Sequence, residues 1–268
     1  MTNNAAEPSA FGAPVVATYG ATDPAAPLVV LLHGRGSNER EILSLAPHLP
    51  DSVAYAAVRA PIAEGGGFAW FANRGIGRPI AESMATTMDW FRGWLDSVSP
   101  VGRPVVLLGF SGGAAFAGGL VLTDPGRFAG AAILYGTLPF NAGVPVTAGQ
   151  LGGVLVFVAQ GDQDGVIPRE LLDQTWTYLL ADSAAPAYAR RNPGGHGITE
   201  QTLAELGGWS GNGWTSSRAR RQGCRPPTRR HQTGPRHGPD LWLAQPRRAR
   251  HRRGHRRNQP HLRRRHPH

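Results

Sequence analysis

The sequence predicts an α/β fold with a mostly parallel central sheet and helices on both faces. From residue 14 onward, apolar runs of strand length alternate with segments of helix length, which is typical of right-handed βαβ units in a doubly wound sheet. Several of these runs are continuously apolar and rich in Val and Leu, as expected for strands that are covered on both faces. The chain has 268 residues and is 41% hydrophobic, which is enough for a substantial core.

The expected strands are residues 15–19, 28–33, 53–58, 104–110, 131–135, 153–159 and 186–190. The expected helices are residues 38–48, 80–98, 112–122, 168–181 and 199–208. Residues 61–79 contain GGGFAWFANRGIG, and this glycine content predicts a loop rather than a regular element. Because ligands bind at the carboxyl ends of strands in such sheets, the loop is a candidate wall of a binding site.

The positive charge of the chain lies almost entirely at its C-terminal end. Residues 1–210 hold 11 Arg and 17 acidic residues, a net charge of −6, whereas residues 211–268 hold 17 Arg and one acidic residue, a net charge of +16. A segment of Arg, His, Pro, Gly and Gln with little apolar periodicity cannot bury enough surface to offset its ordering entropy. We therefore expect a flexible N-terminus at 1–13, a folded domain at 14–210, and a disordered basic tail at 211–268.

The tail has two interpretations. Its composition is also what an out-of-frame reading of a GC-rich gene would give, in which case it has no selected role. An exposed tail of this charge would bind polyanions non-specifically and in a salt-dependent manner. It lacks interleaved aromatic residues and zinc-finger spacing, so no specific nucleic-acid partner is expected.

Several classes of protein are disfavoured by composition. The single cysteine, Cys224, excludes an internal disulfide framework and a multi-cysteine metal site. No window reaches the roughly 18 consecutive apolar residues of a membrane span, and the N-terminus lacks the pattern of a signal peptide. We expect a cytoplasmic protein with no membrane span, no cofactor and no metal, and the oligomeric state, a homodimer included, is left open.

The stretch LLGFSGGAAF at 107–116 matches the pattern G-x-S-x-G between a predicted strand and a predicted helix. In such a turn the serine lies on a sharp, strained bend, and the residues two positions before and after it come too close for side chains. This explains Gly109 and Gly113. The bend would expose the hydroxyl of Ser111, and the N-terminus of the following helix would offer the free N–H of Gly112.

A serine nucleophile needs a base and an acid further along the chain, and this architecture orders them Ser, Asp or Glu, then His. The strand at 153–159 leads into QGDQDGVIP, which offers Asp162 and Asp164. The strand at 186–190 leads into RNPGGHGI, which offers His196. The other histidines before the tail do not follow the last strand: His33 is expected to brace its loop, and His48 to lie on a helix surface.

An oxyanion hole requires a second N–H from the loop after an early strand. The strand at 28–33 is followed by HGRG at 33–36, whose glycines let the backbone approach a substrate oxygen. Arg35 N–H is the expected donor, together with Gly112 N–H.

With these motifs in order, the chain resembles the α/β-hydrolases, and more closely the phospholipase/carboxylesterase family that includes acyl-protein thioesterases. The resemblance covers residues 14 to about 209 and rests on LLHGRGSNE, RAPIAEGGGFAWF, LGFSGG, GDQDGVIP and GGHGI. It implies that Asp164 is the acid and that Trp70 and Phe71 line the substrate pocket. It further implies an α/β-hydrolase fold without a cap domain.

The function implied is a cofactor-free serine carboxylesterase that hydrolyses small or medium carboxylic esters through an acyl-enzyme intermediate. Ser111, His196 and Asp164 would form the triad, and Arg35 and Gly112 the oxyanion hole. An acyl-thioesterase or a lysophospholipase would use the same residues and is the nearest alternative. A different class of function, a polyanion-binding protein that acts through the basic tail, is the second alternative.

Overall fold

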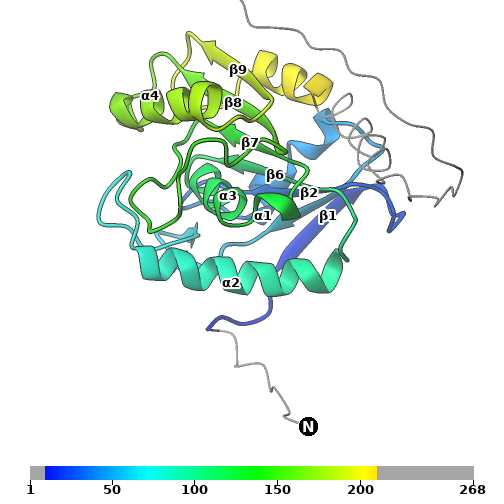
Figure 1. The fold of residues 1–268 in the computed structure, drawn as a ribbon. Coiled ribbons are helices and arrows are strands. Elements are labelled where there is room, and N and C mark those ends of the chain that lie inside the picture. The colour runs from blue at the N-terminus through cyan, green and yellow to red at the C-terminus, as the bar shows by residue number, and fades with distance from the viewer. Residues whose placement is uncertain (1–9, 210–268) are drawn as a thin grey trace, which may run out of the picture. The chain divides into compact units, whose positions relative to one another are not determined.

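The structure is a computed structural model that describes residues 10–209. Its centre is a seven-stranded sheet in the order β1-β3-β2-β6-β7-β8-β9 (Figure 1). Strand β1 pairs antiparallel with β3, and every other neighbouring pair is parallel. The strands are β1 (Val16–Gly20), β2 (Leu28–Leu32), β3 (Ala54–Val58), β6 (Val105–Phe110), β7 (Gly130–Leu134), β8 (Leu155–Gly161) and β9 (Ala187–Asn192).

Helices cover both faces of this sheet. They are α1 (Glu39–Leu43), α2 (Ala81–Val98), α3 (Gly112–Thr123), α4 (Arg169–Thr177) and a last helix at residues 200–209. Two 3₁₀ turns, Ala46–His48 and Pro125–Arg127, and a π-helical turn, Tyr178–Asp182, complete the helical structure of the described residues.

Strand β2 shows how the two faces of the sheet are buried. Leu28, Val30 and Leu32 pack into a core with α2 and α3, whereas Val29 and Leu31 pack into a second core with α1 and the helix at 200–209. All five residues are buried because side chains alternate between the faces and both faces are covered. The expected α/β class, with helices on both faces, is confirmed.

The stretch 61–79 contains a small hairpin that the sequence did not predict. Strand β4 (Ile62–Glu64) pairs antiparallel with β5 (Gly67–Ala69) across the two-residue turn Gly65-Gly66. Both glycines have positive φ, +59° and +84°, as a type I′ turn requires. The predicted loop at 61–79 is therefore partly regular, and these two glycines form the turn of a hairpin.

The hairpin lies against the loop that follows β2. Gly36 N–H donates to the carbonyl of Phe68, and Phe68 N–H donates to the carbonyl of Ser37, each at 2.9 Å. A Cβ on Gly67 would lie 1.9 Å from the carbonyl oxygen of Gly36, so only glycine permits this approach. The hairpin therefore fixes the loop that carries Arg35.

Other differences from the prediction are local. One continuous helix was expected at 38–48, but α1 ends at Leu43 and a separate 3₁₀ turn follows at Ala46–His48. Pro47 in this turn has no backbone N–H to donate. The helix expected at 168–181 closes with the π-helical turn. Residues 136–154, between β7 and β8, contain turns but no helix or strand, which agrees with the absence of a cap domain.

Candidate active site

Ser111 occupies a sharp turn between β6 and α3. Its backbone angles are φ +54° and ψ −114°, outside the regions that a residue with a side chain adopts without strain. Its N–H donates to the carbonyl of Leu134, at the end of β7, at 2.9 Å. The surrounding structure holds this conformation, in which the hydroxyl faces a cavity and not the sheet.

The two glycines that flank the serine are required by close backbone contacts. A Cβ on Gly109 would lie 2.2 Å from the carbonyl oxygen of Gly113, and a Cβ on Gly113 would lie 2.1 Å from that of Leu32. Neither neighbour is a flexible side-chain end, so a methyl group at either position would displace the backbone. The pattern G-x-S-x-G in this chain therefore reflects the packing of the turn.

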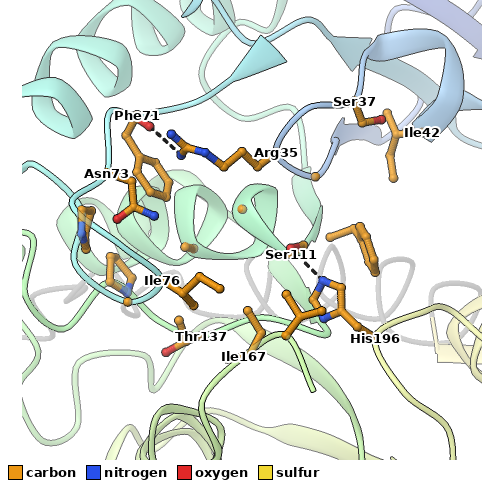
Figure 2. A pocket seen from close by; sticks show the side chains of 18 of the residues that line it. Arg35, Ser37, Ile42, Phe71, Asn73, Ile76, Ser111, Thr137, Ile167 and His196 are labelled. Carbon is orange, nitrogen blue, oxygen red and sulfur yellow. Dashed lines mark hydrogen bonds between the residues drawn. The ribbon is translucent and has the colours of Figure 1, made fainter. Parts of the chain in front are cut away.

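His196 connects Ser111 to Asp164. Its Nε2 lies 2.9 Å from Ser111 Oγ, and its Nδ1 lies 2.9 Å from Asp164 Oδ2. An ionised carboxylate can only accept, so Nδ1–H is the donor to Asp164 and Nε2 is the acceptor for the serine hydroxyl. The imidazole also packs against Phe110, with ring centroids 5.2 Å apart. The structure brings together the three side chains that the sequence singled out, and Figure 2 shows the contact between His196 and Ser111.

Asp164 is held in its ionised form by hydrogen bonds. Its side chain is fully buried, and burial by itself would raise the pKa of the carboxyl. The hydrogen bonds from His196 and from the backbone N–H groups of Ile167 and Val166 outweigh burial and lower the pKa below its ordinary value. Asp162, the alternative acid, is exposed, and its backbone N–H is bonded to the carbonyl of Asn192.

The loops that carry Asp164 and His196 are joined to each other. Gln163 N–H donates to the carbonyl of Gly194 at 3.0 Å. A Cβ on Gly161 would lie 2.3 Å from the carbonyl oxygen of Gly195, so glycine is needed for the two loops to approach. The acid and the base are thus positioned as one unit.

A buried polar network anchors the His196 loop to the sheet. Asn192 Nδ2 donates to the hydroxyl oxygen of Tyr135 at 2.5 Å, and that hydroxyl lies 2.9 Å from Thr202 Oγ1. Asn192 Oδ1 accepts from Gly194 N–H, two residues before His196. All three polar side chains are buried. Sequence reasoning missed this network, and a Tyr directly after β7 followed by an Asn before the His loop is its signal in the sequence.

The two expected oxyanion donors lie close together. An ideal Cβ on Gly112 would lie 3.3 Å from Arg35 N, so the two backbones face each other beside Ser111. Within residues 10–209, neither amide donates to a protein acceptor. The Arg35 side chain forms a bidentate ion pair with Glu64 at 2.5 Å and donates to the carbonyl of Phe71 at 3.0 Å. The guanidinium thus ties the loop to the hairpin and positions its backbone.

The cavity in front of Ser111 has a volume of about 580 Å³ and mainly apolar walls. Phe71 lines it, as expected from the resemblance. Figure 2 shows Phe71, Asn73 and Ile76 on one side of Ser111, with Ser37 and Ile42 on the other. A small apolar or weakly polar molecule fits this space.

Trp70 does not line the cavity, contrary to the expectation. It is 1% exposed, its indole stacks on Phe116 with centroids 4.5 Å apart, and its Nε1–H donates to the carbonyl of His33. The chain bends at Trp70 and Phe71, directly after β5, so that Phe71 faces the cavity while Trp70 faces the core.

His33 braces its loop, as the sequence suggested. It is fully buried, Nδ1 lies 2.7 Å from the carbonyl oxygen of Gly34, and Nε2 accepts from Ala60 N–H at 3.1 Å. Burial lowers the pKa of the imidazole below its ordinary value, and the hydrogen bond to Gly34 only partly opposes this effect. The neutral ring therefore fixes the start of the Arg35 loop.

Residues 10–209 contain neither a candidate metal site nor a candidate membrane span. No group of three or more His, Cys, Asp or Glu in this part of the chain is arranged to hold a metal ion. No helix in it is long and apolar enough to cross a membrane.

The sheet topology and the strand–turn–helix at Ser111 define an α/β-hydrolase fold. The model of the phospholipase/carboxylesterase family matches residues 14–206. The chain therefore belongs to this family and is a hydrolase.

Individual relatives are distant. The protein MhqD of Bacillus subtilis is 25% identical over 187 residues, which cover 68% of this chain and 91% of MhqD. A carboxylesterase from Bacillus cereus superposes with a TM-score of 0.66 at 22% identity, covering 76% of this chain and 94% of that one. Acyl-protein thioesterase 2 from Zea mays superposes with a TM-score of 0.60 at 21% identity, covering 76% and 98%. The structural likenesses establish the shared fold.

Proposed function

We propose that the protein is a serine carboxylesterase that hydrolyses small or medium carboxylic esters with the triad Ser111, His196 and Asp164. The observation that carries the proposal is the pair of 2.9 Å contacts of His196, one to Ser111 Oγ and one to Asp164 Oδ2. They match the geometry of nucleophile, base and orienting acid in serine hydrolases.

In the first half of the reaction, His196 Nε2 removes the hydroxyl proton as Ser111 Oγ attacks the ester carbonyl carbon. The resulting oxyanion accepts hydrogen bonds from Gly112 N–H and Arg35 N–H, neither of which donates to another acceptor within residues 10–209. Asp164, kept ionised by its hydrogen bonds, holds the imidazole in the required tautomer and stabilises the imidazolium.

To complete acylation, His196 donates its proton to the leaving alcohol as the carbon–oxygen bond breaks, which leaves an acyl-enzyme. A water molecule then repeats the attack with His196 as base, the carboxylic acid is released, and the hydroxyl of Ser111 is restored. The apolar cavity of about 580 Å³ suits acyl groups of modest size.

Hydrolysis of p-nitrophenyl butyrate by the full chain tests the proposal. The wild-type protein is expected to release p-nitrophenol, and Ser111→Ala is expected to lower kcat/KM at least about 10,000-fold, since removal of a serine nucleophile typically costs more than that. A Ser111→Ala variant with near wild-type activity would exclude the triad. Acyl chains of increasing length, as esters and as thioesters, would separate the esterase from the thioesterase alternative.

The polyanion-binding alternative depends on residues 211–268, which lie outside the described residues. The same is true of the expected disorder of the tail and of its interpretation as an out-of-frame extension. These remain predictions. Cytoplasmic location and oligomeric state likewise remain predictions.

A further inference from the structure

The cavity has two walls, one on each side of Ser111, and they belong to different hydrophobic cores. Phe71 and Leu138 belong to the core that contains α2 and α3. Ile42 belongs to the core on the opposite face of the sheet, and Leu45 and Ile198 pack against it. Substrate groups on the two sides of the scissile bond therefore meet different surroundings.

His196 identifies the wall that receives the leaving group. The imidazole packs against Phe110, and Phe110 and Ile198 pack against the same core as Ile42. In Figure 2, His196 and Ile42 lie on one side of Ser111, opposite Asn73. Because His196 Nε2 must give its proton to the departing oxygen, the alcohol portion lies along the Ile42 wall and the acyl portion along the Phe71 wall.

Glu41 carries the unbalanced charge on this wall. Among the described residues, three ionisable side chains line the cavity, namely Arg35, Glu41 and His196. Arg35 is neutralised by its ion pair with Glu64. Glu41 accepts hydrogen bonds from two uncharged donors, Ser37 Oγ at 2.5 Å and Asn38 Nδ2 at 3.1 Å, and within residues 10–209 it has no ion-pair partner.

The same contacts have a structural role. Asn38 caps α1 by accepting from the N–H groups of Arg40 and Glu41, and its side-chain amide donates to the carboxylate of Glu41. Both carboxylate oxygens are therefore engaged. Glu41 is exposed to solvent, and these bonds hold its carboxylate at the edge of the cavity.

From this geometry we propose that Glu41 sets the charge preference of the leaving-group side of the cavity, so that esters of cationic and neutral alcohols are hydrolysed in preference to esters of anionic alcohols. The inference rests on the proposed function. An alcohol that carries a carboxylate or a phosphate would meet the charge of Glu41, and among the described residues that line the cavity the one arginine, Arg35, is already paired with Glu64. A lysophospholipid whose leaving group is a net anion, such as glycerol phosphate, is accordingly expected to be a poor substrate.

Three butyrate esters test the proposal because they differ mainly in the charge of the alcohol. Butyrylcholine is cationic, 3,3-dimethylbutyl butyrate is its neutral isostere, and 3-(butyryloxy)propionate is anionic. Release of butyrate is followed by titration at pH 7.5 for the full chain and for Glu41→Gln. The wild type is expected to rank the esters cationic, neutral, anionic, and Glu41→Gln to lower the cationic-to-anionic ratio of kcat/KM about tenfold, as expected for one partly screened charge.

The matched control is Glu82→Gln, which removes the same charge from an exposed position on α2 that does not line the cavity. Its ratio is expected to equal that of the wild type. Ratios measured on one preparation do not depend on the folded fraction, so weaker capping in Glu41→Gln does not affect them. An unchanged ratio in Glu41→Gln, with the neutral ester still hydrolysed, would overturn this inference and leave the esterase standing. If the wild type hydrolysed none of the three esters, the proposed function itself would fail.

Discussion

The hydroxyl oxygen of Ser111 lies 2.9 Å from Nε2 of His196, a residue 85 positions further along the chain. Two loops at the carboxyl ends of parallel strands make this contact, one after β6 and one after β9. The His196 loop is in turn bonded to the Asp164 loop. The site therefore depends on the sheet that sets the spacing of these loops, and its parts can be tested separately.

The identity of the acid can be tested by comparing Asp164→Asn with Asp162→Asn. Replacing Asp164 leaves the shape of the side chain but favours the wrong imidazole tautomer, so kcat is expected to fall about 10,000-fold. Asp162 is exposed, and its substitution is expected to change kcat by no more than about twofold. Steady-state kinetics with p-nitrophenyl butyrate would give kcat for both variants. A larger loss of kcat in Asp162→Asn than in Asp164→Asn would assign the acid to Asp162.

The packing of the serine turn can be tested with Gly109→Ala. A methyl group there would lie 2.2 Å from a backbone oxygen, so the free energy of unfolding is expected to fall by more than about 3 kcal/mol. Gly93→Ala is the control, since a Cβ at Gly93 meets nothing within 4 Å in helix α2 and should stabilise the protein by about 0.8 kcal/mol. Urea denaturation measures both variants. Equal stability of the two would contradict the account of the turn.

Positioning of His196 by the buried network can be tested with Tyr135→Phe. The substitution removes one hydroxyl, so that Asn192 and Thr202 each lose a hydrogen bond and keep the 3.3 Å contact between their side chains. Stability should therefore fall by about 1–3 kcal/mol and kcat about tenfold, with KM unchanged. Tyr178→Phe is the control, because its hydroxyl donates to the carbonyl of Thr147, and Tyr178 does not line the cavity. It should lose stability without losing kcat. An equal effect of both variants on kcat would show that the network has no positioning role.

Because His33 is buried and neutral, we expect the protein to lose stability in mild acid. Its pKa is lowered in the folded protein, so as the pH falls below the ordinary value of 6.5 the unfolded chain binds a proton that the native chain does not. The free energy of unfolding should therefore decrease between pH 7 and pH 5, above the range in which Asp164 and Glu39, both with lowered pKa, are protonated. Urea denaturation across this range should show a smaller decrease for His33→Asn. Parallel curves would assign the decrease to other groups.

The sheet, the covering helices and the order of the site motifs could be predicted because each has a local cause. Continuous apolar runs of strand length identify the buried strands. The backbone contacts of Gly109 and Gly113 require glycine at both positions, so the glycine spacing identifies the serine turn. The polar residues follow the ends of parallel strands, and such strands end on the same edge of the sheet.

The features that were missed depend on long-range contacts. Trp70 and Phe71 are adjacent aromatics with opposite orientations, and only the stacking on Phe116 shows which one enters the core. The ion pair of Arg35 with Glu64 requires the β4–β5 hairpin to lie against the loop after β2. Local propensity cannot reveal such tertiary contacts.

The central claim is that Ser111 is a nucleophile activated by His196. Its most direct test is labelling of the full chain with a fluorophosphonate, followed by peptide mapping of the modified residue. The account predicts one modified residue, Ser111, and loss of labelling in both Ser111→Ala and His196→Ala. Modification of a different residue, or labelling that persists in His196→Ala at the wild-type rate, would contradict it.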